Sequence, residues 1–185
     1  MGIKKLKILM VIAIVILMPS KAYSEDGYVD DATVIKWGEN AISSIMSMDH
    51  SNLEDKKIER RLFFTDKGYK DFNQALYDSR LLEMLASEKM EMIPYVLCDP
   101  SITSKSVETL EKSFWDFSKD TEEIDVWKLK SFVKFQYKTA AKSRDNYMVV
   151  ELVIHNGVGN DRGSLYIDRW IQAYSSKESS LCSGL

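Results

Sequence analysis

Few side chains in this sequence are of the types that catalyse reactions or bind metals. It has two cysteines, Cys98 and Cys182, and two histidines, His50 and His155. Neither cysteine has a histidine near it in the sequence, which argues against thiol catalysis, because a nucleophilic cysteine needs an activating base. In an exported protein an even pair of cysteines instead predicts one disulfide, with two free thiols or pairing between chains as the alternatives.

The histidines do not have the spacing of a metal site. His50 stands in the polar stretch D-H-S-N, and His155 ends a predicted strand next to Gly157, so both positions are typical of turns. No H-E-x-x-H or EF-hand pattern is present, and the glycines of residues 157–163 lack the lysine and the following helix of a phosphate loop. We therefore predict no metal, no cofactor and no catalytic residue. If the protein were an enzyme, the candidates would be His50, His155, Asp168, Tyr147 and Tyr166.

The first 24 residues predict a secretory signal peptide. Lys4, Lys5 and Lys7 precede the apolar run of residues 8–18, and Ala22-Tyr23-Ser24 offers small residues for cleavage. The run is shorter than the roughly 20 apolar residues that cross a bilayer, although an uncleaved short anchor is the alternative. We predict cleavage after Ser24, a periplasmic domain over residues 25–175, a flexible tail over 176–185, and no transmembrane span in the mature chain.

The charge of the mature chain argues against nucleic acids and anionic membranes as partners. Cleavage removes four lysines and no acid, which leaves 21 basic against 28 acidic residues, a net charge of −7. Both kinds of partner require a basic surface. We expect protein partners instead.

The first half of the domain predicts helices. Apolar residues at helical spacing indicate a helix over residues 31–48, with Asp30 or Asp31 as its N-cap, and a short helix over 53–61 capped by Ser51 or Asn52. Thr65 begins a third helix that runs to about residue 79 and buries Tyr69, Phe72 and Leu76, and residues 81–86 add a further turn or two. Gly68 lies inside the first turn, where it lowers helix propensity, so we expect close packing there.

The second half predicts strands. Residues 126–139 alternate between apolar and polar side chains, which is typical of a strand with one face on a core. Further strands are predicted over 87–98, with Pro94 at an edge or bulge, over 146–155 and over 164–174. Residues 107–117 fit either a helix or a strand, residues 119–125 are predicted as a loop, and 141–145 as a turn. Helices followed by antiparallel strands predict an α+β fold, with the helices packed on one face of a bent sheet.

An aromatic row is the main candidate for a partner surface. At strand spacing, Tyr166, Trp170 and Tyr174 fall on one face of the last strand, with Leu165, Ile167, Ile171 and Ala173 on the other. Aromatic rows are favoured at protein interfaces. The alternative is that the row packs under the helices as part of the core.

Three blocks of the sequence resemble the DotI/IcmL/TraM family of type IVB secretion and conjugation systems. They are V-I-K-W-G-E-N-A at residues 34–41, F-F-T-D-K-G-Y-K-D-F-N-Q-A-L at 63–76, and the strand blocks from Trp127 through N-Y-M-V-V-E-L-V-I to R-G-S-L-Y-I at 162–167. The middle block is the most specific, although Tyr69 replaces the usual tryptophan. The positions that match the family pattern are Trp37, Ala41, Phe64, Thr65, Gly68, Tyr69, Phe72, Leu76, Trp127 and Gly163.

The resemblance implies a cone-shaped fold of the nuclear-transport-factor-2-like type and a structural, non-enzymatic role beside secretion-machine subunits or copies of itself. Family members at the core of the machine carry a cytoplasmic segment and a membrane-spanning helix before this domain, where this chain has a signal-like leader. An accessory or a free periplasmic paralogue therefore fits better than a core subunit. The same fold type also hosts isomerases and dehydratases, so a small-molecule-binding or isomerase-like protein is the alternative.

Overall fold

The computed structural model describes residues 28–111, 121–158, 161–175 and 182, and within them helices precede a mainly antiparallel sheet. The helices are α1 (Asp31–Met46), α2 (Leu53–Arg61), α3 (Asp66–Asp78) and α4 (Leu81–Ser87). The strands are β1 (Met48–Asp49), β2 (Glu91–Val96), β3 (Ser101–Glu111), β4 (Thr121–Lys138), β5 (Ser143–Asn156) and β6 (Leu165–Tyr174). The predicted α+β class is confirmed.

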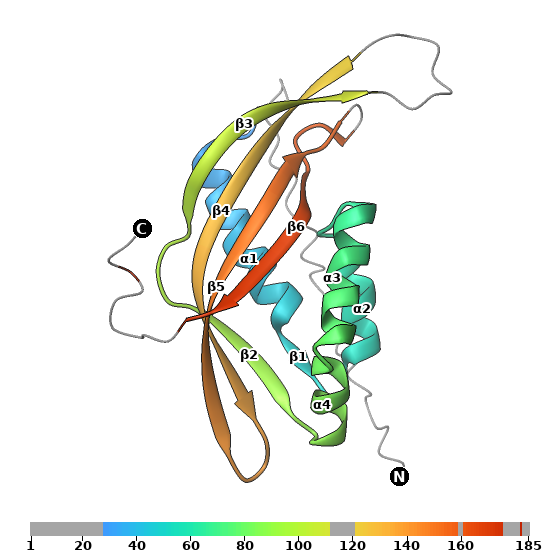
Figure 1. Ribbon diagram of the computed structural model, residues 1–185, viewed down its shortest axis with the longest axis vertical. Coiled ribbons are helices and arrows are strands. Elements are labelled where there is room, and N and C mark those ends of the chain that lie inside the picture. The colour runs from blue at the N-terminus through green and yellow to red at the C-terminus, as the bar shows by residue number, and fades with distance from the viewer. Residues whose placement is uncertain (1–27, 112–120, 159–160, 176–181, 183–185) are drawn as a thin grey trace, which may run out of the picture.

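The sheet curls around β4, which is its longest strand. Its order is β1-β2-β4-β5-β6, and β3 also pairs with β4. Strand β2 pairs with β4 from Val133 to Lys138 and β3 pairs with it from Thr121 to Lys130, so the two share one side of β4 in succession. The helix α1 lies across one face of the curved sheet, and α2, α3 and α4 stand together beyond β6 (Figure 1).

The core lies between α1 and the face of the sheet that α1 covers. The alternation predicted for β4 holds there, because Trp127, Leu129, Val133 and Phe135 are all almost fully buried. They pack in one cluster with the apolar stripe of α1, which consists of Val34, Ala41, Ile42, Ile45 and Met46. Ser131 lies in the same row and is also buried, and among the described residues its hydroxyl group has no hydrogen-bond partner.

Local sequence explains where the helices begin. The Asp30 side chain accepts a hydrogen bond of 2.7 Å from the Thr33 amide and so caps α1, which lowers the pKa of Asp30. Thr65 caps α3 in the same way through the Gly68 amide. Asn52 precedes α2 as predicted, but its side chain makes no capping bond and instead accepts a hydrogen bond from the Asp49 amide.

Several predicted boundaries are wrong. α1 ends at Met46, and the next residues form the short strand β1. The strand expected from residue 87 begins only at Glu91, because α4 continues to Ser87. Residues Thr121 to Asp125 belong to the acidic segment predicted as a loop. They form the start of β4, because β3 pairs with them. Residues Ser143 to Asp145, predicted as turn, belong to β5.

Candidate interaction surface

The predicted aromatic row on β6 does not form one row, because a β-bulge interrupts the strand. Ile167 pairs with Ile154 and Arg169 pairs with Val153, which leaves Asp168 as the extra residue. A bulge shifts the alternation of side chains by one position. Trp170 therefore lies over the buried Leu152 of β5, on the core side of the sheet, whereas Tyr166 lies opposite His155 on the other side.

Trp170 belongs to an aromatic cluster under α3. Its ring centroid lies 5.2 Å from that of Phe72 and 6.4 Å from that of Phe64, and the Phe64 and Phe72 rings are 4.9 Å apart. Phe64 is buried, and Trp170 packs at the margin of the core with part of its surface exposed. These contacts favour the core interpretation for Trp170.

The C-terminal end of β6 is the part that faces solvent. Tyr174 is 80% exposed and Ile171 is 45% exposed. β6 is also the last strand of the sheet order, and edge strands present unpaired backbone groups to other chains. The candidate surface on this strand therefore reduces to its last residues, around Tyr174.

The N-terminal end of β6 is hydrogen-bonded to the segment that leads into α3. The Ile167 amide donates to the Phe63 carbonyl at 2.8 Å, and the Thr65 amide donates to the Ile167 carbonyl at 3.1 Å. The Thr65 hydroxyl group donates to the Asp168 carboxylate at 2.9 Å. The start of α3 is thus bonded to β6 as a short parallel partner.

Gly68 allows α3 to approach β6 this closely. A Cβ atom at this position would lie 2.9 Å from the Asp168 carbonyl oxygen and still closer to that of Ile167. Both are backbone atoms, which cannot rotate away as a side chain would. The predicted close packing at Gly68 is present, and it explains a glycine inside a helical turn.

Asp168 is held in its charged form. Burial acts to raise its pKa, but the hydrogen bond from Thr65 and the nearby His155 and Lys67 outweigh burial, so the pKa lies below its ordinary value. The Lys67 ammonium group lies 3.3 Å from the carboxylate. Because Asp168 sits at the bulge and bonds the cap of α3, its charge serves the contact between helix and strand.

Of the catalytic candidates, His155 lies opposite Tyr166 and near Asp168, whereas His50 and Tyr147 lie elsewhere. His50 lies in an exposed turn with its Nδ1 atom 3.7 Å from Asp49, and His155 is half-buried on β5. Tyr147 lies opposite Lys134 on β5. Among the described residues, no group of three or more histidine, cysteine or acidic side chains is placed to hold a metal ion.

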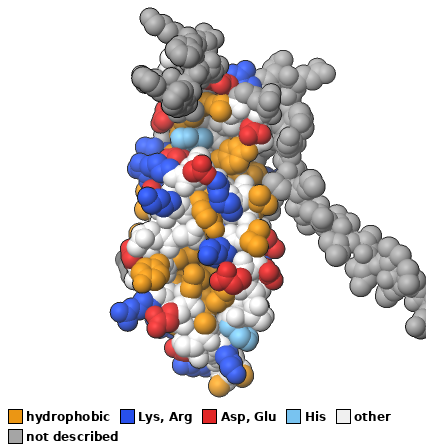
Figure 2. Space-filling view, turned by 90° about the vertical axis from the view of Figure 1, so that its right-hand side faces the viewer, with side chains coloured by type: hydrophobic (Ala, Val, Ile, Leu, Met, Phe, Trp, Pro, Cys, Tyr) orange, Lys and Arg blue, Asp and Glu red, His pale blue; other side chains and the backbone are white. Residues whose placement is uncertain are grey.

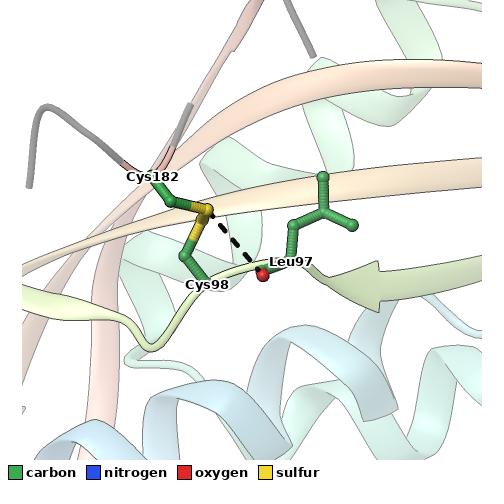
Figure 3. Close-up of a disulfide and its surroundings, with 3 residues drawn as sticks. All are labelled: Leu97, Cys98 and Cys182. Atoms are coloured by element: carbon green, nitrogen blue, oxygen red, sulfur yellow. Dashed lines mark hydrogen bonds between the residues drawn. A yellow bond between two sulfur atoms is a disulfide. The ribbon is translucent and has the colours of Figure 1, made fainter. Parts of the chain in front are cut away.

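The two cysteines form the predicted disulfide (Figure 3). Their Cα atoms are 5.8 Å apart and 84 residues separate them in the sequence. Cys98 lies in the connection between β2 and β3, where the Leu97 amide bonds the Phe132 carbonyl of β4. The bond therefore fastens Cys182 to the connection between β2 and β3.

The other motif positions serve packing. The Trp37 ring on α1 lies 6.1 Å from that of Phe63, and the Trp127 indole donates to the Asp31 carboxylate at 3.0 Å. The Tyr69 hydroxyl group donates to the Lys57 carbonyl, which ties α3 to α2.

Gly163 lies in the turn before β6, where its φ of 90° favours glycine. Ala41 and Leu76 are buried in the core.

The outward side chains at α2 are not among the site residues predicted from the sequence. Ile58 is 73% exposed and Leu62 is 60% exposed, whereas Arg60 between them is 1% exposed. The sequence does contain a signal, because Ile58 and Leu62 are four residues apart and share one helical face, whereas Leu53 lies on another. A helix without a single apolar stripe exposes some of its apolar side chains and is therefore a candidate surface.

These features define a helix-covered, curled sheet whose concave side is filled by its own apolar side chains. Comparison with known proteins gives its family. Residues 17–173 match the DotI/IcmL model, described as an inner-membrane complex component of the type IVB secretion system. The chain belongs to this family. No curated protein matches the sequence.

Solved structures share the fold at low sequence identity. The periplasmic domain of DotI is 19% identical with a TM-score of 0.67, and the match covers 80% of this chain and 98% of that one. An IcmL-like type IV secretion system protein from Legionella pneumophila subsp. pneumophila str. Philadelphia 1 is 15% identical with a TM-score of 0.65, covering 81% and 96%. A periplasmic fragment of TraM is 16% identical with a TM-score of 0.61, covering 83% and 99%. Within the described part of this chain, no helix is long and apolar enough to span a membrane.

Proposed function

We propose that this protein is an exported, non-enzymatic component or accessory of a type IVB secretion or conjugation apparatus and that it acts in the periplasm by protein–protein contact. Membership of the DotI/IcmL family supports the apparatus. The three solved neighbours are described as periplasmic domains or as a secretion-system protein, which supports the compartment. The signal-like leader and the disulfide fit an oxidising export compartment.

The concave side of the sheet is filled by apolar side chains, and this supports a non-enzymatic role. An enzyme of this fold type needs polar groups inside the cone, whereas Trp127, Phe135 and Phe64 are almost fully buried there and belong to one apolar cluster. The two histidines lie outside this cluster, in a turn and on the opposite face of β5. The chemistry that this domain offers to other molecules is therefore on its surface.

The exposed end of β6 supports contact with proteins. Tyr174 combines a large apolar ring with a hydroxyl group, and such side chains contribute strongly at interfaces. It is 80% exposed at the end of an edge strand. Ile171 on the same strand is 45% exposed but lies on the opposite face of the sheet.

The proposal is tested by affinity purification of the tagged full-length protein from gently solubilised envelopes, with mass spectrometry of the bound proteins. Recovery of secretion-machine subunits is the expected result. Recovery of the mature protein alone, soluble and monomeric, would overturn the proposal and favour a ligand-binding or isomerase-like role.

Two exposed tyrosines provide matched variants for this experiment. Tyr174→Ala should lower the recovery of subunits about tenfold, which corresponds to the loss of one interface aromatic. Tyr77→Ala on α3 is the control, because Tyr77 is 78% exposed, almost the same as Tyr174. Equal recovery with the two variants would exclude the end of β6 as the contact.

A further inference from the structure

In and directly after α2, a charged side chain is buried while aliphatic side chains are exposed, which is the reverse of what their polarity predicts. Arg60 faces the interior, and Ile58 and the C-cap residue Leu62 face solvent. At about 100° per residue, Ile58 and Leu62 lie on one side of the helix and Arg60 on the opposite side. A local conflict between sequence and fold of this kind is expected at functional sites.

The interior contacts of Arg60 do not account for this orientation. Its guanidinium group donates to the Lys56 carbonyl at 3.0 Å and to the Met48 sulfur at 3.2 Å. Among the described residues it forms no ion pair with a carboxylate, and burial lowers its pKa. Burial outweighs the electrostatic attraction of Tyr69 and Glu54 in its effect on the Arg60 pKa, so the monomer gains little by burying this cation.

The outward side of α2 has the composition of a contact surface. Ile58 and Leu62 are four residues apart and form an adjacent apolar pair on the helix. Leu62 continues into Phe63, which is half-buried and packs on Trp37. Figure 2 shows hydrophobic side chains exposed among charged ones on the side of the molecule where α2 and α3 lie.

The charges around this pair are acidic. Glu54 and Asp55 are exposed on the outward side of α2, and neither forms an ion pair within the described part of the chain. Glu59 is paired with Lys56, and Arg61 is engaged by Asp66 and by the Tyr69 ring. The exposed Lys57 offsets one of these two acids, and Glu54 also attracts the buried Arg60, so the charge next to Ile58 and Leu62 is negative by a small excess.

We propose that the α2 outer face, formed by Glu54, Asp55, Ile58 and Leu62, binds an amphipathic segment of a partner protein that has apolar residues flanked by lysine or arginine. The proposal rests on the function proposed above and names one contact through which it acts. Helical apolar pairs bind such segments by packing side by side, and the flanking acids select basic partners. The same acids oppose an anionic lipid surface and oppose a second copy of this face, because like charges would meet.

Site-specific photo-crosslinking in cells tests this contact in the full-length protein. Ile58→p-benzoylphenylalanine and Leu62→p-benzoylphenylalanine place the probe on the α2 outer face. Tyr77→p-benzoylphenylalanine is the matched control, because Tyr77 is 78% exposed on the neighbouring helix, against 73% for Ile58. The crosslinked peptide is identified by mass spectrometry.

The expected result is an adduct from positions 58 and 62, and none from 77, whose crosslinked peptide is apolar and rich in lysine or arginine. Adding Glu54→Lys and Asp55→Lys should lower the adduct yield about fivefold, because two rim charges are reversed. An adduct with a second copy, with lipid or with an acidic peptide would overturn the proposal, as would no adduct at all. If the affinity purification recovers subunits while position 58 yields nothing, this contact fails and the proposed function stands. If neither succeeds, the proposed function fails as well.

Discussion

The helices α2 and α3 follow one another in the sequence but differ in which of their side chains are buried. In α3, Phe72 and Leu76 are buried, and the charged residues Lys70 and Asp71 face solvent. In α2, Arg60 is buried and the aliphatic pair of the α2 outer face is exposed. The difference shows that α3 serves the monomer, whereas part of α2 is not explained by the monomer alone.

The contacts that hold each helix explain the contrast. α3 is bonded to β6 through Thr65 and Ile167 and packs its aromatic residues on Trp170. α2 is held by fewer and more polar contacts, among them the hydrogen bond from Tyr69 to the Lys57 carbonyl and that from Arg60 to Met48. We expect substitutions to have large effects on stability around α3 and small ones on the outside of α2.

Phe64→Ala should give the largest effect. Phe64 is 1% exposed and contacts Phe72, Tyr69 and Trp170, so its removal leaves a cavity between the start of α3 and β6. We expect a loss of about 3–5 kcal/mol in the free energy of unfolding, measured by urea denaturation. A loss below about 1 kcal/mol would mean that α3 is not anchored through this cluster.

Gly68→Ala should destabilise the protein by about 2–3 kcal/mol, because the new Cβ atom forces α3 away from the β6 backbone. Urea denaturation measures it. Ala75→Gly, at an exposed position of the same helix, is the control and should cost about 1 kcal/mol through helix propensity. If Gly68→Ala instead stabilised the protein, the close approach would not be rigid.

Arg60→Met should raise the free energy of unfolding by about 1–2 kcal/mol, because it replaces a buried cation, which among the described residues forms no salt bridge and is attracted only electrostatically by Glu54, by an apolar side chain of similar length. Thermal and urea unfolding at neutral pH measure the change. Arg61→Met is the control, since Arg61 is exposed and pairs with Asp66. A loss of stability in Arg60→Met would show that the guanidinium group is well compensated in the interior.

Asp168→Asn should lower stability at neutral pH by less than about 1 kcal/mol, because the partly screened contacts with Lys67 and His155 are lost. The pKa of Asp168 is below its ordinary value in the folded state, so its contribution is fully present above the ordinary value. That contribution is lost as the pH falls through the lowered pKa. The wild type and the variant should thus converge in unfolding experiments between pH 5 and pH 2, values set by the ordinary carboxyl pKa of about 4.

Asp71→Asn is the control for this pH dependence. Asp71 also lies near Lys67, at 3.7 Å, but on the exposed side of α3. It should leave the pH dependence of the wild type unchanged. If the stability of both variants depended on pH in the same way, the Asp168 carboxylate would have no specific role in the pH dependence.

Leu62→Ala should have the smallest effect. Leu62 directly follows α2 and is 60% exposed, so its truncation should change the free energy of unfolding by no more than about 0.5 kcal/mol. Leu76→Ala is the matched substitution on α3, where the leucine is 5% exposed, and it should cost about 2–4 kcal/mol. Similar losses for the two leucines would remove the contrast between the helices.

Much of the fold follows from local sequence. The bounds of α2 agree with the prediction, the Thr65 cap begins α3 where expected, and the alternation in β4 identifies its buried side. Helical and strand periodicity are properties of adjacent residues, so they can be read without knowing the neighbours. The family resemblance, carried mainly by the block around Phe64 and Gly68, is confirmed by the family match.

Long-range contacts decided the rest. The segment from Thr121 to Asp125 became strand because β3, the preceding strand, pairs with it across a connection that a short window of residues does not include. The bulge at Asp168 reversed the side-chain phase of β6 and so placed Trp170 against the margin of the core, on the other side of the sheet from Tyr166. Neither the pairing register nor the bulge is encoded in a short window of residues.

The sequence by itself therefore determined the α+β class, the helical and strand segments, the cysteine pair and the family. The tertiary structure decided which side of α2 faces the interior and where β6 is free to contact another molecule. The physical reason is that periodicity defines a helical or strand face, whereas only packing against distant segments determines which face is buried.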